Sequence, residues 1–298
     1  MKSCLVIVAA FSALSASSAI AQTFETVDKS PAGDRFEKSA NFDILGIRPG
    51  DTIEDVKVKM KAKFSEITQP EETRLKGSVS TPEGARVEME FVNEIAFVTP
   101  DSKNQVYVNF ASEVFDNRVT AIRRTVHFDA FTTAEIFRKQ VAEKYGQPSI
   151  VQDENGFLNL YYLYASGRLM SEADAPKTKE NCKYLNQGSL CDYVEKKPSP
   201  ETGKTLEIAQ RPCAAFFHSN WQSIGKYRFD QRYSVIEDDQ CDGIMLVSMS
   251  TNQPELNSAD FTLVDVKRAY GHQTALDAAI EAKLKQGVDM DKVAKPRL

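Results

Sequence analysis

Residues 51–64 read DTIEDVKVKMKAKF, and residues 132–145 read TTAEIFRKQVAEKY, a similar pattern displaced by 81 positions. Apolar residues recur at helical spacing in both stretches, at positions 56, 60 and 64 and at positions 137, 141 and 145. This spacing places the apolar side chains on one face of a helix. Each stretch also begins with a capping-box pattern, Asp51-x-x-Glu54 in the first and Thr132-x-x-Glu135 in the second. The two stretches therefore predict two amphipathic helices.

Segments that alternate between apolar and polar residues follow each predicted helix. They cover residues 86–91, 106–110 and 122–128 after the first helix, and residues 157–165, 213–217, 226–235, 244–249 and 261–264 after the second. Period-two alternation predicts half-buried strands. Two capped helices can resemble each other by chance, but similar strands after both of them favour an internal duplication.

The expected fold class is α+β, with two related helix-on-antiparallel-sheet units, a C-terminal helix and a disulfide-bearing insertion. The first unit spans residues 41–128 and the second spans residues 129–287. The stretch 167–212 is rich in lysine, glutamate, proline, asparagine and serine, which predicts an inserted loop or irregular hairpin in the second unit.

Three further segments complete the expected organisation. An apolar stripe from Val266 to Leu284 predicts the C-terminal helix. Residues 22–40 lack periodicity, which predicts a flexible N-terminal arm, and residues 288–298 resemble them as a C-terminal tail.

The first 21 residues have the three parts of a secretory signal peptide. Lys2 provides the basic start, residues 5–14 are apolar, and Ala19-Ile20-Ala21 provides a small-residue cleavage site. No later apolar run approaches the roughly 18 residues that span a bilayer. The sequence therefore predicts a soluble protein exported to the bacterial periplasm, with secretion into the medium as the alternative.

The cysteines are expected to form disulfides. Five are present, and removal of the signal peptide leaves all but Cys4. An even number in an exported chain indicates disulfides, and we expect pairs Cys182–Cys191 and Cys213–Cys241, although four cysteines allow three pairings. No C-x-x-C motif and no histidine at zinc-ligand spacing is present, which argues against a redox or zinc site.

Charge and motifs exclude several classes of function. The chain has a net charge of −5 and a pI near 5.5, so it lacks the clustered positive charge of nucleic-acid binding or of a basic membrane-surface helix. No H-E-x-x-H, G-x-S-x-G, dinucleotide-binding or phosphate-loop motif occurs, so no metal, no cofactor and no local catalytic site is predicted. Only a Ser-His-Asp site assembled from distant residues stays open.

The three histidines are predicted to be incidental. His127 lies on the polar side of a predicted strand, and His272 lies in the C-terminal helix. His218 is the one with the most suggestive surroundings, because it lies close to Trp221 at the end of a cysteine-bearing strand, where the two side chains could frame a pocket.

Residues 157–164 read FLNLYYLY, with apolar side chains on both faces of the predicted strand. This pattern predicts a covered central strand. In the alternative, one face is open, and the binding surface would consist of Tyr161, Tyr162, Tyr164, His218 and Trp221.

The acidic stretch 237–243 partly matches a calcium-binding loop. In the register that starts at Asp238, Gln240 and Met249 occupy two of the ligand positions, and Met249 stands where a bidentate glutamate is required. The stretch is therefore predicted to be a solvated acidic turn.

Two motifs resemble those of uncharacterised exported bacterial proteins. Residues 46–56, GIRPGDTIEDV, are similar to a helix start found there, and residues 144–148, KYGQP, are similar to a helix end. The order of helix and antiparallel strands also resembles β-lactamase-inhibitor-protein-like domains. The resemblance implies the fold and an envelope location, and it transfers no catalytic residue to this chain.

These observations favour a non-catalytic periplasmic interaction protein, which would bind another envelope protein through a sheet face or through its acidic surface. A small-molecule or lipid carrier is one alternative and requires a deep apolar cavity. A hydrolase is the other and requires a non-local active site.

Overall fold

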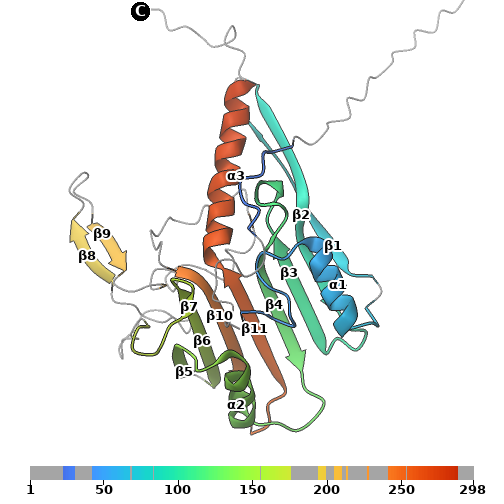
Figure 1. The fold of residues 1–298 in the computed structure, drawn as a ribbon, viewed down its shortest axis with the longest axis vertical. Coiled ribbons are helices and arrows are strands. Elements are labelled where there is room, and N and C mark those ends of the chain that lie inside the picture. Colours follow the sequence, from blue (N-terminus) through green and yellow to red (C-terminus); the bar gives the residue numbers. More distant parts are fainter. Residues whose placement is uncertain are drawn as a thin grey trace, which may run out of the picture.

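The computed structural model describes residues 23–30, 42–67, 69–82, 84–154, 156–175, 194–198, 205–209, 213, 227, 241–252 and 254–287. Within these ranges the chain forms three α-helices and a nine-stranded antiparallel sheet (Figure 1). The predicted α+β class is therefore confirmed.

Each half of the chain places a helix before antiparallel strands. α1 (Ile53–Lys63) precedes β1 (Glu71–Ser80), β2 (Arg86–Val98), β3 (Asn104–Phe110), the 3-10 turn η1 (Glu113–Phe115) and β4 (Val119–His127). α2 (Ala134–Tyr145) precedes β5 (Ile150–Glu154), β6 (Phe157–Ala165), β7 (Arg168–Leu169), β10 (Cys241–Ser250), β11 (Ser258–Asp265) and α3 (Val266–Gln286). A separate two-stranded ribbon is formed by β8 (Val194–Pro198) and β9 (Thr205–Ala209).

The strands join in the order β1-β2-β3-β4-β11-β10-β6-β5, with β7 paired to β6. The last strand of each half therefore lies at the centre of the sheet. β4 and β11 pair there in antiparallel register, from His127 opposite Ser258 to Ala121 opposite Val264. Both halves thus contribute to one continuous sheet (Figure 1).

Both predicted helices form, but the N-cap of each lies one residue later than predicted, at Thr52 and at Thr133. Thr52 caps α1, because its hydroxyl accepts the Asp55 N–H at 3.1 Å and the Asp55 carboxylate accepts the Thr52 N–H at 3.0 Å. Thr133 caps α2 through its hydroxyl. Asp51 does not cap a helix, because its buried carboxylate pairs with Lys59 at 2.5 Å. The predicted capping box of α1 is therefore corrected by one position, and that of α2 is replaced by a simple N-cap at Thr133.

The two edge strands, β1 and β5, are absent from the sequence prediction. No side chain of β1 is fully buried, so its sequence lacks the strong alternation of a strand that faces the core. β7 lies inside the predicted insertion 167–212 and still joins the sheet through β6. The strands predicted over 213–217 and 226–235 lie outside the described residues, apart from Cys213 and Tyr227.

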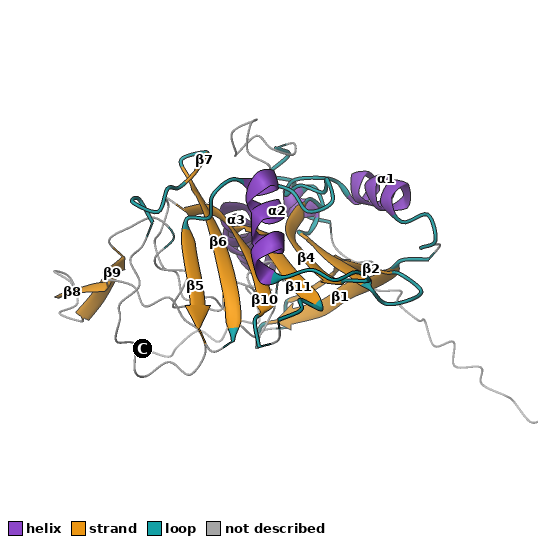
Figure 2. Ribbon diagram, turned by 90° about the horizontal axis from the view of Figure 1, so that it is seen from below, coloured by secondary structure: helices purple, strands orange, loops and turns teal. Residues whose placement is uncertain are grey.

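α1 and α2 lie on the same face of the sheet (Figure 2). Val56 and Met60 of α1, with Phe137 and Val141 of α2, are buried against alternating apolar residues of the inner strands. Burial of these stripes supplies the main stabilisation of each helix, because helices this short are marginal by themselves.

α3 begins on the opposite face and then leaves the sheet. Its first turn packs through Val266 and Ala269 against Val264 and Ile244. Farther along, α3 lies beside the projecting ends of β1 and β2 (Figure 1). There Leu276 belongs to the same buried cluster as side chains of β2 and η1.

Residues 23–30 belong to the predicted flexible arm 22–40, but the structure packs them against η1 and α3. The Phe24 ring is buried in a core cluster with side chains of β2 and α3. The Asp28 carboxylate pairs with the buried Arg268 guanidinium at 2.9 Å. Because these partners lie far along the chain, local periodicity could not show them.

The predicted disulfide between Cys213 and Cys241 is confirmed. Both cysteines are fully buried, and the bond attaches the segment at residue 213 to the start of β10. The other predicted pair, Cys182 and Cys191, lies outside the described residues.

Tyr162→Phe is expected to raise the free energy of unfolding by about 1 kcal/mol. The Tyr162 side chain is fully buried, and its hydroxyl has no hydrogen-bond partner in the part of the chain that the structure describes. Tyr145→Phe is the matched control, because the Tyr145 hydroxyl donates to the Asp43 carbonyl oxygen at 3.0 Å, and its removal should lower stability by about 1 kcal/mol. Urea denaturation measures both variants. A stability loss in Tyr162→Phe would contradict the expectation.

Candidate functional site

The face of the sheet opposite α1 and α2 carries an array of polar side chains on β3, β4 and β11 that keep part of their surface exposed. We call this array the polar face; its members are Gln105, Tyr107, Arg123, Thr125, Asp260 and Thr262, all half-buried or exposed. Strand register sets them in two rows: Tyr107, Arg123 and Thr262 in one, and Gln105, Thr125 and Asp260 in the other. β3 and β4 from the first half of the chain and β11 from the second all contribute.

Several interactions fix the side chains of the polar face. The Arg123 guanidinium pairs with the Glu94 carboxylate at 2.7 Å and lies over the Tyr107 ring, 5.3 Å from its centroid. The Glu94 side chain is only 13% exposed, whereas that of Arg123 is 39% exposed, so the pair is anchored in the protein and presents its cationic end to solvent. The Thr125 hydroxyl donates to the Asp260 carboxylate at 2.6 Å.

This arrangement can stack and form hydrogen bonds. The next row on the same face sets His127 of β4 opposite Ser258 of β11, and no hydrogen bond joins these two side chains. Across the described ranges, no group of three or more histidine, cysteine or acidic side chains is placed to hold a metal ion. The contacts on the polar face are a cation over an aromatic ring, an ion pair and a hydrogen bond between a hydroxyl and a carboxylate.

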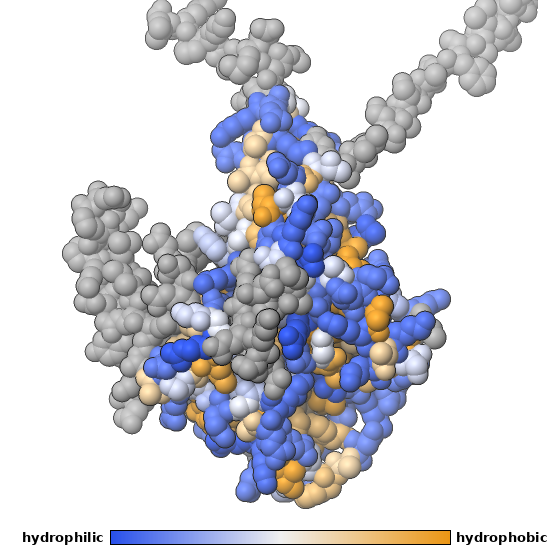
Figure 3. Space-filling model, in the orientation of Figure 1, coloured by the Kyte–Doolittle hydropathy of each residue, from blue (hydrophilic) through white to orange (hydrophobic). Residues whose placement is uncertain are grey.

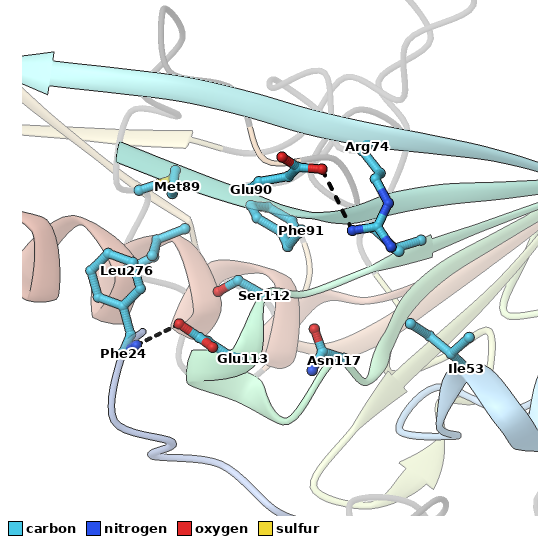
Figure 4. Close-up of a pocket in the computed structure, with 11 residues that line it drawn as sticks. Phe24, Ile53, Arg74, Met89, Glu90, Phe91, Ser112, Glu113, Asn117 and Leu276 are labelled. Atoms are coloured by element: carbon cyan, nitrogen blue, oxygen red, sulfur yellow. Dashed lines mark hydrogen bonds and ion pairs between the residues drawn. The ribbon is translucent and has the colours of Figure 1, made fainter. Parts of the chain in front are cut away.

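A cavity of about 250 Å³ lies between β2, η1, α3 and the segment 23–30 (Figure 4). One part of its lining is apolar and comes from Phe24, Ile53, Met89, Phe91, Val92 and Leu276. The other part is polar and comes from Arg74, Glu90, Ser112, Glu113 and Asn117. This site is separate from the polar face in the residues that form it.

Ser112, in the wall of this cavity, contacts His272 of α3. The His272 Nε2 atom accepts the Ser112 backbone N–H at 2.9 Å and lies 2.9 Å from the Ser112 hydroxyl oxygen. Burial among the rings of Phe91, Phe115 and Tyr227 lowers the pKa of His272 to about 3. Such an imidazole is a poor general base at neutral pH, and its Nε2 lone pair is already engaged. The pair therefore does not supply the non-local active site that a hydrolase would need.

The tyrosines of the predicted binding surface are buried. Tyr161, Tyr162 and Tyr164 are 5%, 0% and 1% exposed, because β6 lies between β5 and β10 and is covered on both faces. Their burial agrees with the covered-strand interpretation and corrects the alternative of an open tyrosine platform. The other two members of that surface, His218 and Trp221, lie outside the described residues.

The remaining candidates from the sequence are also accounted for. His127 is exposed at the end of β4. Asp242 is buried, pairs with Lys267 at 2.6 Å and accepts the Gly167 N–H at 2.6 Å, so this member of the acidic stretch is a structural residue and not part of a solvated turn. Residues 237–240 lie outside the described residues.

The face that carries α1 and α2 is mostly hydrophilic (Figure 3). Apolar side chains gather at its lower end in that view. Near the start of α2, Phe131 and Ile136 are 69% and 49% exposed, which makes this end the natural competitor of the polar face as a contact surface.

Sequence reasoning did not single out Arg123, Tyr107 or Glu94 as site residues. The alternation around positions 106–110 places Tyr107 opposite the apolar face of its strand, which is the one signal available. Arg123 and Tyr107 lie opposite each other because of the β3–β4 register. This pairing between strands leaves no signal in the local sequence.

Comparison with protein-family models, with curated proteins and with solved structures finds no match for the chain. In the described part of the chain, no helix has the length and apolarity needed to cross a membrane.

Proposed function

We propose that the chain is a non-catalytic protein-binding module of the bacterial envelope and that the polar face is its partner surface. The observation that carries the proposal is the stack of Arg123 on Tyr107, anchored by Glu94 on an open sheet face. Tyrosine and arginine are enriched at the residues that dominate the energy of protein interfaces. Side chains already held by a rigid sheet lose little freedom on binding, which lowers the entropic cost of association.

Two observations support an envelope location for this function. Residues 1–21 have the pattern of a signal peptide. The Cys213–Cys241 disulfide is typical of proteins that fold in an oxidising compartment. We therefore place the protein in the periplasm, with another envelope protein as its partner.

The two halves of the sheet are proposed to descend from one ancestral helix-and-strand unit. Thr52 and Thr133 cap α1 and α2 at equivalent places in the repeated sequence. The final strands of the halves then pair at the centre of the sheet. In this arrangement the polar face consists of β3 and β4 from the first half and β11 from the second. The proposed partner surface would therefore exist only in the duplicated protein.

Site-specific photo-crosslinking in the producing cells tests the partner surface. A photoreactive phenylalanine analogue replaces Tyr107 or Thr262 on the polar face, Ile136 at the apolar end, or Val58 on α1, which is 59% exposed. The expected result is one discrete adduct with the same envelope protein from positions 107 and 262, and none from position 58. An adduct from Ile136 alone, or no adduct from either polar-face position, would contradict the proposal.

A further inference from the structure

The cavity beside η1 combines apolar side chains with polar groups whose hydrogen-bonding capacity is not fully used. Met89, Phe91 and Leu276 face Ser112, Glu113 and Asn117 across it (Figure 4). Its volume of about 250 Å³ equals that of roughly eight water molecules in the liquid. A site of this size suits a compact ligand, smaller than those of typical drug-sized pockets.

The charges at the cavity lie in two separate places. The Arg74 and Lys76 side chains both pair with the Glu90 carboxylate, at 3.6 and 3.2 Å, so this group carries one net positive charge. The Glu113 carboxylate accepts the Phe24 backbone N–H, but it pairs with no cation among the described residues. Lys283, which contacts the same N-terminal segment, is engaged by the Thr23 carbonyl oxygen at 2.5 Å. One carboxylate therefore remains without a counter-ion at the cavity wall.

A second polar side chain at the cavity, that of Asn117, also has hydrogen-bonding capacity that the described residues do not use. The Asn117 side-chain amide has no hydrogen-bond partner within the described ranges, although its backbone N–H donates to the Ser112 carbonyl oxygen. Asn117 and Asp116 both have left-handed backbone conformations, with φ of 50° and 53°. Consecutive residues in this conformation hold the Asn117 backbone in a tight turn at the cavity wall.

We propose that this cavity is a binding site for a small primary amine with an apolar body. The ammonium group donates to the Glu113 carboxylate and the Asn117 amide oxygen, and the apolar body packs against Phe91, Met89 and Leu276. An anionic ligand would place a second negative charge beside Glu113, and a neutral apolar ligand would leave both polar groups unpartnered. The inference uses none of the polar-face residues and stands independently of the proposed protein partner.

The N-terminal segment is part of this site. Phe24 forms one wall of the cavity, and the Thr26 hydroxyl donates to the Glu113 carbonyl oxygen at 2.8 Å. Occupancy of the cavity should therefore slow amide hydrogen exchange in residues 23–30, because the ligand adds contacts to Phe24 and Glu113 that the open segment lacks.

Calorimetric titration of the full-length mature protein with benzylamine tests the site. Benzyl alcohol and benzoate serve as neutral and anionic probes of similar size. The expected result is saturable binding of benzylamine at one site, at least about tenfold tighter than either other probe, because one charge-assisted hydrogen bond accounts for that ratio. Equal binding of benzyl alcohol, tighter binding of benzoate or no saturable binding of benzylamine would overturn the proposal.

Two variants with opposite expected effects localise the binding. Glu113→Gln should weaken benzylamine binding at least about tenfold, and Asn117→Asp, which keeps the turn and adds a carboxylate, should strengthen it. Glu135→Gln on α2 removes an exposed carboxylate outside the cavity lining and should leave the affinity unchanged. An unchanged affinity in Glu113→Gln or a weakened one in Asn117→Asp would overturn the assignment.

Discussion

Arg268→Met should lower the free energy of unfolding by about 3–5 kcal/mol, the range measured when one member of a buried ion cluster is removed. Arg268 is 1% exposed and lies between two carboxylates, Asp28 at 2.9 Å and Asp265 at 3.3 Å. Methionine preserves much of the apolar volume of the arginine stem, so the loss reports on the charges. The substitution leaves two buried carboxylates without the cation that they share.

Urea denaturation of a matched pair measures this effect. Lys285→Met breaks an exposed helical pair with Glu281 and should change stability by less than about 0.5 kcal/mol. Adding Asp28→Asn to Arg268→Met should recover part of the lost stability, because it removes one of the two buried carboxylates that Arg268 bridges. A loss below about 1 kcal/mol in Arg268→Met, or no recovery in the double variant, would show that the cluster does not hold the N-terminal segment.

Acidification should destabilise the fold through His272. The folded protein holds the pKa of His272 at about 3, whereas the ordinary value is 6.5, because burial disfavours the charged imidazole. Between these values the unfolded chain binds a proton that the folded chain does not. The contribution to stability is therefore complete above pH 6.5 and decreases as the pH falls toward 3, by about 1.4 kcal/mol per pH unit.

Stability curves at pH 7.5, 5.5 and 4.5 measure this effect before most carboxylates titrate. Wild type should lose roughly 2–3 kcal/mol between pH 7.5 and 4.5. His272→Gln, whose amide oxygen can still accept the Ser112 N–H, should lose much less over the same interval. His127→Gln, at an exposed position, should keep the wild-type slope. Equal slopes for wild type and His272→Gln would refute burial of a neutral imidazole as the cause.

Local patterns in the sequence were sufficient for the helices and for the strands that face the core. The recurrence of Val56 and Met60, and of Phe137 and Val141, placed α1 and α2 correctly, because both helices bury one regular stripe. The cap of α1 lies one residue later than predicted, at Thr52, and the Asp51 carboxylate instead pairs with Lys59 and accepts the Arg48 N–H. β1 was not predicted because few of its side chains are buried. An edge strand of this kind does not need a strict alternation of apolar and polar residues.

Contacts between distant residues could not be predicted from one sequence. Ser112 and His272 are 160 positions apart, and Asp28 and Arg268 are 240 apart. Neither pair leaves a local signal, since each partner alone looks like a surface residue. The same holds for the polar face, because the pairing of β4 with β3 and with β11 brings its residues together. The apolar alternation on both faces of residues 157–164, in contrast, correctly indicated a covered strand.

The affinity of the partner captured through position 107, measured by surface biosensing with purified oxidised protein, tests the central claim most directly. Arg123→Ala should raise Kd by about tenfold or more, the effect of losing an interface arginine at a hot spot. Arg138→Ala removes an exposed arginine of α2, on the face opposite the polar face, and should leave Kd unchanged, with both variants retaining the wild-type thermal transition. An unchanged Kd in Arg123→Ala, or an equal rise in both variants, would contradict the assignment of the polar face as the partner surface.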